Sequence, residues 1–204
     1  MTDADRARPL MAPYEPPSKF CIVSLGNTPD DVEERACSAV RSCFELNCEI
    51  LCPEPRPEFA LDTSRDQYNS LEILDWLESR FPRPDQWILG ITNVDLAIPV
   101  LTFVFGEARL GGRSAVISAF RLREEFHGRP ADTMMLLSRV EKEAIHEVGH
   151  MLGLTHCLDR NCVMYPSNSL AQTDVKSTRL CPGCRSSLPP WCSTEPSGPD
   201  RTGV

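Results

Sequence analysis

Residues 146–156 read HEVGHMLGLTH, and this pattern constrains the chain more than any other feature. His146 and His150 are four residues apart, so on an α-helix both imidazoles would project from one face, a turn apart. Two such imidazoles can bind one zinc ion, and His156 is the expected third ligand. Gly153 can adopt a positive φ, which would end the helix and return the chain beneath the metal. A helix with incidental histidines is the alternative, and the joint spacing makes it the weaker one.

Glu147 follows the first of these histidines, about 100° further around a helix. From that position its carboxylate can reach a water in the open coordination position without occupying the position itself. A catalytic zinc with three protein ligands lowers the pKa of such a water towards about 7. The pattern therefore predicts a hydrolytic zinc site with Glu147 as general base. The fourth histidine, His127 in the segment EEFHGRP, is interpreted as an exposed loop residue and not as a ligand.

Four of the ten cysteines have the spacing of a second metal site: Cys157, Cys162, Cys181 and Cys184. Four thiolates can enclose a zinc ion with no open position, so this site would be structural, and the chain would bind two zinc ions. The segment has few apolar residues, and the metal would supply its folding energy. Reduced cysteines without metal and a nucleic-acid-binding zinc ribbon are the alternatives. Since the first of these cysteines directly follows His156, loss of the structural zinc should loosen the third catalytic ligand.

The other six cysteines are more scattered and are expected to be small buried hydrophobic residues, with a disulfide or a further metal site as the alternative. They are Cys21, Cys37, Cys43, Cys48, Cys52 and Cys192.

Charge and composition exclude several classes of protein. The net charge of the 204-residue chain is −8, which argues against binding to nucleic acid through phosphate contacts. No stretch approaches the roughly 20 apolar residues that would span a membrane. The polar, proline-rich start of the chain does not resemble a secretory signal, so we expect a cytoplasmic protein. As a separate expectation, the protein is a monomer.

Hydrophobic periodicity predicts strands alternating with helices. Helices are expected over 29–46 with Thr28 as N-cap, over 66–81, and from an N-cap at Asp132 to about Leu152. The expected strands are 19–25, 48–52, 86–92, 101–105 and 115–118. This order indicates an α/β fold with a mixed sheet and packed helices. A single domain is predicted over 19–187, with an upper part 19–153, a lower part 154–187, and disordered tails at 1–18 and 188–204.

The combined histidine and cysteine pattern resembles the archaemetzincins, a branch of the metzincin zinc peptidases with an additional four-cysteine zinc site. The matching residues run from His146 through Cys162 and Met164 to the pair Cys181-x2-Cys184. The spacer after Met164 has 16 residues, one fewer than in the usual pattern. The segments RDQYNS (65–70) and DLAIPVLTFVFGEA (95–108) also look like family blocks, so the resemblance covers about 19–187.

The resemblance implies a metzincin-like zincin fold: a twisted mixed sheet with packed helices, an active-site helix, and a small zinc-stapled C-terminal subdomain. Met164 would be the Met-turn residue, an apolar floor beneath the imidazoles. An edge strand within 101–118 would bind extended peptide by strand addition. The predicted function is therefore a zinc-dependent peptidase acting on peptides or proteins. The alternative is a zinc-stabilised scaffold that binds peptide with little or no catalysis. We expect residues 53–66 and 120–131 to border the cleft.

Overall fold

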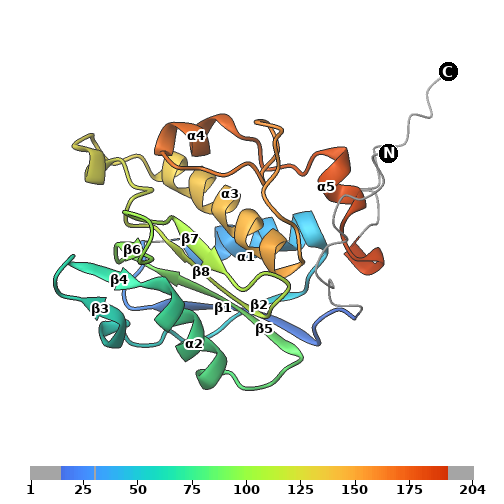
Figure 1. The fold of residues 1–204 in the computed structure, drawn as a ribbon, viewed down its shortest axis with the longest axis horizontal. Coiled ribbons are helices and arrows are strands. Elements are labelled where there is room, and N and C mark those ends of the chain that lie inside the picture. Colours follow the sequence, from blue (N-terminus) through green and yellow to red (C-terminus); the bar gives the residue numbers. More distant parts are fainter. Residues whose placement is uncertain (1–14, 30, 193–204) are drawn as a thin grey trace.

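A five-stranded mixed sheet lies at the centre of the molecule, in a computed structural model that describes residues 15–29 and 31–192 (Figure 1). The strand order is β2-β1-β5-β8-β7, in which the first four strands are parallel and β7 is antiparallel to β8 at the edge. The expected mixed α/β fold is thereby confirmed. The strands are β1 (Lys19–Leu25), β2 (Cys48–Ile50), β5 (Gln86–Thr92), β7 (Gly106–Ala108) and β8 (Ser114–Ser118).

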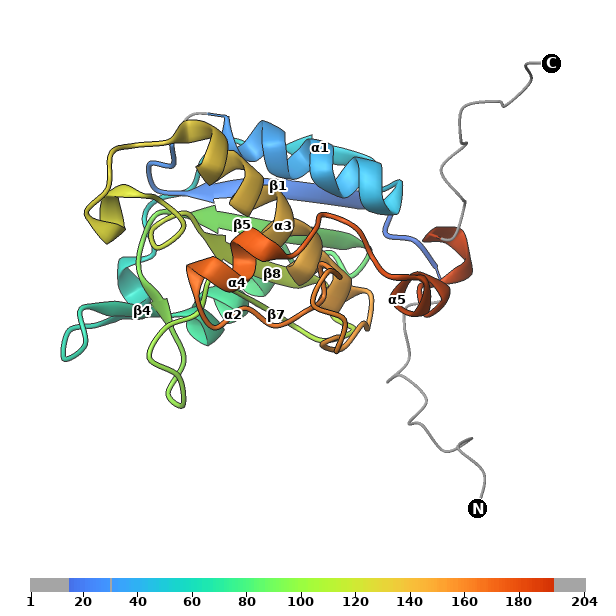
Figure 2. The same cartoon turned by 90° about the horizontal axis from the view of Figure 1, so that it is seen from above.

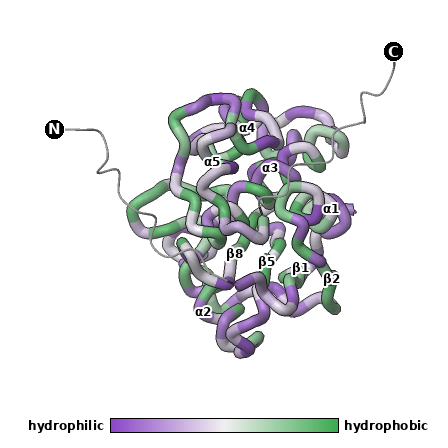
Figure 3. The backbone as a smooth tube through the Cα atoms, turned by 90° about the vertical axis from the view of Figure 1, so that its right-hand side faces the viewer, coloured by the Kyte–Doolittle hydropathy of each residue, from purple (hydrophilic) through white to green (hydrophobic). Residues whose placement is uncertain are grey.

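Helices cover both faces of this sheet. The helices α1 (Val32–Phe44) and α3 (Thr133–Met151) pack on one face, and α2 (Ser70–Arg80) packs on the other (Figure 1). Side chains alternate along each strand: Leu89 and Ile91 of β5 face α1 and α3, while Ile88 faces α2. All seven residues of β5 are buried, as expected for a parallel strand covered on both sides. In Figure 3 the hydrophobic colour of the central strands runs between the helical layers.

A smaller three-stranded sheet and a short C-terminal segment complete the structure. The small sheet is formed by β3 (Leu61–Asp62), β4 (Gln67–Asn69) and β6 (Leu96–Ala97). After α3 the chain carries two short helices, α4 (Leu170–Val175) and α5 (Pro182–Ser186), and α4 lies beside α3 (Figure 2). Short 3₁₀ helices occur at Glu58–Ala60, Glu125–His127 and Pro190–Cys192. Within the described residues, no helix is long and apolar enough to cross a membrane.

Two of the three predicted helices begin later than expected. The first begins at Val32, preceded by Asp31 with a φ of 64°, and Thr28 is not its N-cap; the Thr28 hydroxyl instead donates to Glu33 at 2.6 Å. The second helix, α2, begins at Ser70, because residues 67–69 form β4. Its N-cap is Asn69, whose side-chain oxygen accepts a hydrogen bond from the Leu71 N–H. The prediction for α3 is confirmed, since the Asp132 carboxylate caps a helix that ends at Met151.

The predicted strands also differ in two places. The second strand ends at Ile50, which leaves Cys52 exposed, so the burial expected for that cysteine is wrong. Residues 101–105 form no strand; only Val104 bridges to Leu96, and the edge strand β7 begins at Gly106. Of the other scattered cysteines, Cys43 is partly buried and the remaining four are buried.

The packed region continues past residue 187, where the sequence suggested the domain end. Leu188 and Cys192 are buried, and the Trp191 ring lies edge-on to Trp87 with their centroids 6.4 Å apart. These apolar side chains close the core beside α1. Residues 1–14 and 193–204 of the predicted tails lie outside the described residues.

Candidate metal centres and cleft

The helix α3 presents His146, Glu147 and His150 to a cleft of about 550 Å³. Gly153 has a φ of 86°, as predicted, and its N–H donates to the His150 carbonyl. This left-handed turn ends the helix and brings His156 back to the same cleft. The His156 ring centroid lies 5.3 Å from that of His146 and 4.9 Å from that of His150. One nitrogen from each ring lies within 4.8 Å of the others, so the predicted trio is brought together.

The hydrogen bonds of the two helical imidazoles leave them suited to a metal ion. Nδ1 of His146 lies 2.8 Å from the Val163 carbonyl oxygen, and Nδ1 of His150 lies 2.7 Å from that of Leu154. A carbonyl oxygen only accepts, so Nδ1 carries the proton and Nε2 keeps a lone pair. The two Nε2 atoms are 3.1 Å apart. Two lone pairs this close need a cation between them, and two nitrogens at about 2.0 Å from a tetrahedral zinc lie about 3.3 Å apart.

The surroundings keep the imidazoles in the neutral form that binds metal. Burial lowers the pKa of His146 well below its usual value and that of His150 to about 4, and it also lowers the pKa of His156. The buried Lys176 ammonium lowers all three pKa values further. Protons therefore compete weakly with a metal ion at this site.

Glu147 is only 4% exposed and lies against the edge strand. Burial raises the pKa of its carboxyl well above the ordinary value, and the nearby Glu143 and Glu107 carboxylates raise it further. A Cβ at Gly106 would lie 2.7 Å from Glu147 Oε1 and 2.8 Å from its Cγ. Only a glycine therefore leaves room for this carboxylate beside β7.

Met164 is fully buried next to the same helix. A Cβ at Gly149 would lie 2.4 Å from its Sδ atom, so the methionine packs directly on the helix between the two histidines of α3. The neighbouring Val163 supplies the carbonyl that orients His146. Met164 is thus a buried apolar contact of α3, and its role as a Met-turn residue stays a prediction.

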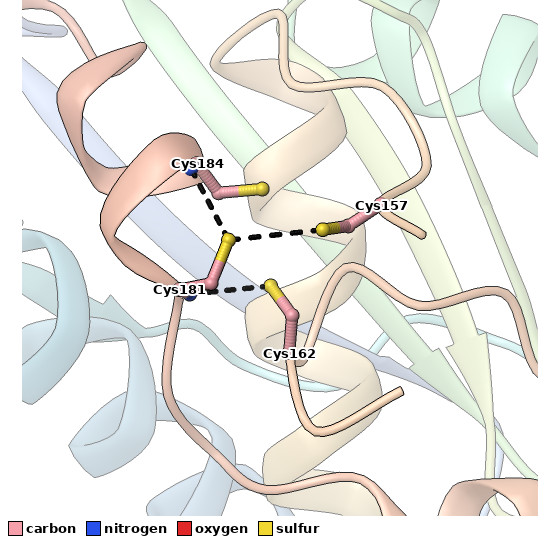
Figure 4. A group of neighbouring side chains, drawn as sticks. All are labelled: Cys157, Cys162, Cys181 and Cys184. Carbon is pink, nitrogen blue, oxygen red and sulfur yellow. Dashed lines mark hydrogen bonds between the residues drawn. The ribbon is translucent and has the colours of Figure 1, made fainter. Parts of the chain in front are cut away.

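Four sulfur atoms converge in a second cluster (Figure 4). Cys157 and Cys162 come from the loop after α3, while Cys181 is the N-cap of α5 and Cys184 lies in its first turn. The Sγ atoms of Cys157 and Cys181 are 3.7 Å apart, and all four lie within 4.8 Å of one another. Two sulfurs bound to a tetrahedral zinc at about 2.3 Å lie about 3.8 Å apart, so the cluster fits that ion. The Cys184 backbone N–H donates to the Cys181 sulfur and lowers the pKa of that thiol.

The two metal-ligand clusters share a short stretch of main chain. The Cys157 N–H donates to the Met164 carbonyl at 2.9 Å, and the Tyr165 N–H donates to the Cys162 carbonyl at 3.0 Å. Residues 157–165 thus link the cysteine cluster to the floor of the histidine cluster. His127, by contrast, is exposed and belongs to neither cluster, and its Nε2 lies 3.0 Å from the Arg121 carbonyl oxygen.

Sequence patterns did not indicate Gly106 or Gly149, because the spacing of neither residue reveals a close approach. They also missed three buried cations, two on α3 and one directly after α4. Arg139 pairs with Glu124 and Asp174, and Lys142 donates to the carbonyls of Thr173 and Asp174. Lys176 Nζ lies 3.1 Å from Glu143 Oε1. The two groups form an ion pair, but their geometry is not that of a hydrogen bond. These cations tie α4 to the active-site helix.

The cleft is walled by two segments on either side of the histidines. The wall residues differ from those expected, since neither 53–66 nor 120–131 contributes. One wall comes from the chain leading into β7 and the other from the loop before α4. The lining residues are Leu101, Thr102, Phe103, Val104, Phe105, Gly106, Glu107, Ala108, Leu110, Glu143, Thr155, Pro166, Ser167 and Asn168, with the motif residues.

The family profile described as Peptidase family M54 matches residues 66–189 of the chain. The chain belongs to this family. An archaemetzincin of Methanocaldococcus jannaschii is 42% identical over 170 residues, covering 83% of this chain and 92% of the relative. The archaemetzincin of Natronomonas pharaonis is 38% identical over 167 residues, covering 80% of this chain and 95% of the relative.

Solved structures give the same result for this M54 peptidase. A zinc-dependent peptidase from Methanocorpusculum labreanum superposes with a TM-score of 0.76 at 28% identity, covering 83% of this chain and 99% of that one. The archaemetzincin of Archaeoglobus fulgidus, solved with malonate, superposes with a TM-score of 0.69 at 37% identity and the same coverage. The resemblance inferred from the sequence is thus confirmed, and the chain is a zinc metallopeptidase whose substrates are peptides or proteins.

Proposed function

We propose that His146, His150 and His156 hold the catalytic zinc of this peptidase and that Glu147 is its general base. The observation that carries the proposal is the pair of Nε2 lone pairs 3.1 Å apart, with both Nδ1 protons donated to carbonyls. A bound zinc would supply a Lewis acid that polarises the scissile carbonyl and activates water.

Glu147 is placed to move the proton. It follows His146 on α3 and lines the same cleft, so its carboxylate can accept a proton from the attacking water. The protonated carboxyl can then deliver that proton to the leaving amine. Its burial excludes bulk water, which keeps the transferred proton at the site. Gly106 supports this role by leaving room for the carboxylate beside β7.

The substrate is proposed to bind as an extended strand along β7. This strand pairs with β8 on one side only, in the part of the chain that the structure describes, so its outer edge offers main-chain groups to a peptide. The edge borders the cleft that holds the histidines. Phe103 and Phe105 provide an apolar surface on this wall, with their ring centroids 5.2 Å apart.

The second zinc is proposed to be structural and bound by the four cysteines. Their number and convergence leave no open coordination position, so this ion would stabilise the fold without taking part in hydrolysis. The chain would bind two zinc ions. We divide the domain at Gly153, with the strands and α3 in the upper part and the cysteine cluster in the lower part.

The variant Glu147→Ala tests the assignment of the base. It should keep both zinc ions by elemental analysis yet lose peptide hydrolysis by about 10²- to 10⁴-fold, the usual contribution of a general base. Glu141→Ala is the matched control. Glu141 also lies on α3, but it does not line the cleft, and its carboxylate is 3.4 Å from the Arg35 guanidinium. Hydrolysis by Glu147→Ala at the wild-type rate would refute the mechanism. Peptide binding without any hydrolysis by the zinc-loaded wild type would instead favour the scaffold.

A further inference from the structure

Residues 65–67 and 95–102 come together next to one wall of the cleft, and the proposed mechanism assigns no role to Arg65, Gln67 or Asp95. Arg65 donates from Nη1 to the Ile98 carbonyl at 3.1 Å and from Nη2 to the Leu101 and Thr102 carbonyls at 2.8 and 3.1 Å. Its Nε donates to Gln67 Oε1 at 2.9 Å. One guanidinium therefore holds three main-chain carbonyls and the amide beside it.

Gln67 completes this arrangement and is itself fully used. It is 7% exposed, and its Nε2 donates to the Thr102 carbonyl at 2.8 Å and to Asp95 Oδ2 at 3.0 Å. With Oε1 accepting from Arg65, the amide orientation is fixed by its partners. The Thr102 carbonyl accepts from both side chains, one for each lone pair.

A second arginine holds the side chains of the same wall. Arg121 forms two hydrogen bonds to Asp95, at 2.6 and 2.7 Å, and its guanidinium lies over the Phe103 ring, 4.4 Å from the centroid. Phe103 in turn packs edge-on against Phe105. Asp95 thus connects Gln67, which holds the Thr102 carbonyl, with Arg121, which lies over the Phe103 ring.

None of these four polar residues lines the cleft, whereas Leu101, Thr102 and Phe103 do. The network therefore acts on the wall from behind. This wall precedes β7 and contains no regular strand from 101 to 105. Main-chain bonds hold Val104 and Phe105, whereas the carbonyls of Leu101 and Thr102 are held by side chains. A guanidinium suits the task because its planar fork donates in several fixed directions, which a lysine cannot reproduce.

We propose that Arg65 and Gln67 are positioning residues for peptide binding, which fix the 101–105 wall before the substrate arrives. The proposal rests on the proposed peptide site in the cleft and names what shapes one side of it. Pre-formed walls reduce the ordering that a substrate must impose on binding. Loss of the network should therefore weaken binding of a peptide that reaches the wall, and leave the reacting groups on α3 unchanged.

The test compares Arg65→Met with Arg83→Met, a control in which an exposed arginine loses only a local pair with Asp85. The probes are a fluorogenic octapeptide chosen from a peptide-library digest with the wild type, and a truncated version with one residue on each side of the scissile bond. For the octapeptide we expect KM to rise about tenfold and kcat to change less than twofold. A misplacement of the reacting groups by 1 Å would instead lower kcat by roughly 10²-fold. The truncated peptide should be cleaved as by the wild type.

A second readout avoids turnover. In the Glu147→Ala background, Arg65→Met should raise the Kd of the octapeptide by the same factor while zinc content stays unchanged. Arg65→Lys, which keeps the charge and loses the fork, should show a smaller rise and serves if the methionine variant does not fold. An unchanged KM for the octapeptide, or equal losses on both peptides, would overturn the positioning role. A wild type that hydrolyses no library peptide would instead overturn the proposed function.

Discussion

Gly149→Ala tests whether Met164 is packed as tightly against α3 as the structure indicates. The added Cβ would lie 2.4 Å from Met164 Sδ and 3.0 Å from its Cε. Ordinary contacts are about 3.5–4.0 Å, so the closer overlap exceeds about 1 Å. Met164 is fully buried and has no solvent to move into. Such overpacking costs about 1–3 kcal/mol, while alanine in a helix interior recovers about 1 kcal/mol relative to glycine.

Because the overlap exceeds about 1 Å, we expect the upper part of that cost, about 2–3 kcal/mol, and hence a net destabilisation of about 1–2 kcal/mol after the gain in helix propensity. For a chain of this size that lowers Tm by about 2–8 °C. Differential scanning calorimetry with excess zinc measures the shift, and elemental analysis shows whether the histidine site still fills. In a Met164→Ala background the clash partner is gone, and Gly149→Ala should then stabilise the protein. A rise in Tm in the wild-type background, or the same loss in both backgrounds, would show that the packing argument is mistaken.

Two further variants test the supports of the site. Gly106→Ala should push the Glu147 carboxylate aside and lower kcat by about 10- to 100-fold, given the cost of misplaced groups, with zinc content unchanged. Steady-state kinetics with elemental analysis checks this, and wild-type kcat would contradict it. Cys181→Ala should lower total zinc by more than one ion per chain, because the loosened main chain also misplaces His156. The exposed Cys52→Ala is its control, and full activity of Cys181→Ala would refute the coupling.

The convergence of the histidines and of Cys181 with Cys184 was predictable from sequence because their geometry is mostly local. A separation of four residues on a helix places His146 and His150 together whatever surrounds the helix. A glycine that can adopt a positive φ then returns His156 within one turn. The same holds for Cys181 and Cys184, which flank a single turn of helix.

The segment 101–105 was mispredicted because its conformation depends on distant residues. The run LTFVF reads as a strand by apolar content, yet the carbonyls of Leu101 and Thr102 are held by Arg65 and Gln67. The start of α2 was misplaced for a related reason, since Tyr68 pairs with Leu96 of β6. Hydrophobic periodicity carries no information about partners more than 25 positions away.

The lower part of the domain is held at two separate places, although its sequence suggested only a metal. Near its start, main-chain hydrogen bonds join Cys157 to Met164 and Tyr165 to Cys162, beside the four converging sulfur atoms that would bind the proposed structural zinc. Near α4, two side chains of α3 hold the chain: Arg139, which is 1% exposed, donates to the Asp174 carboxylate, and Lys142 donates to the Thr173 carbonyl. A buried cation is costly unless paired, and the Asp174 carboxylate and nearby carbonyls compensate it here. Because these contacts involve no cysteine, removing the proposed structural zinc should release the His156 segment while α4 stays docked on α3.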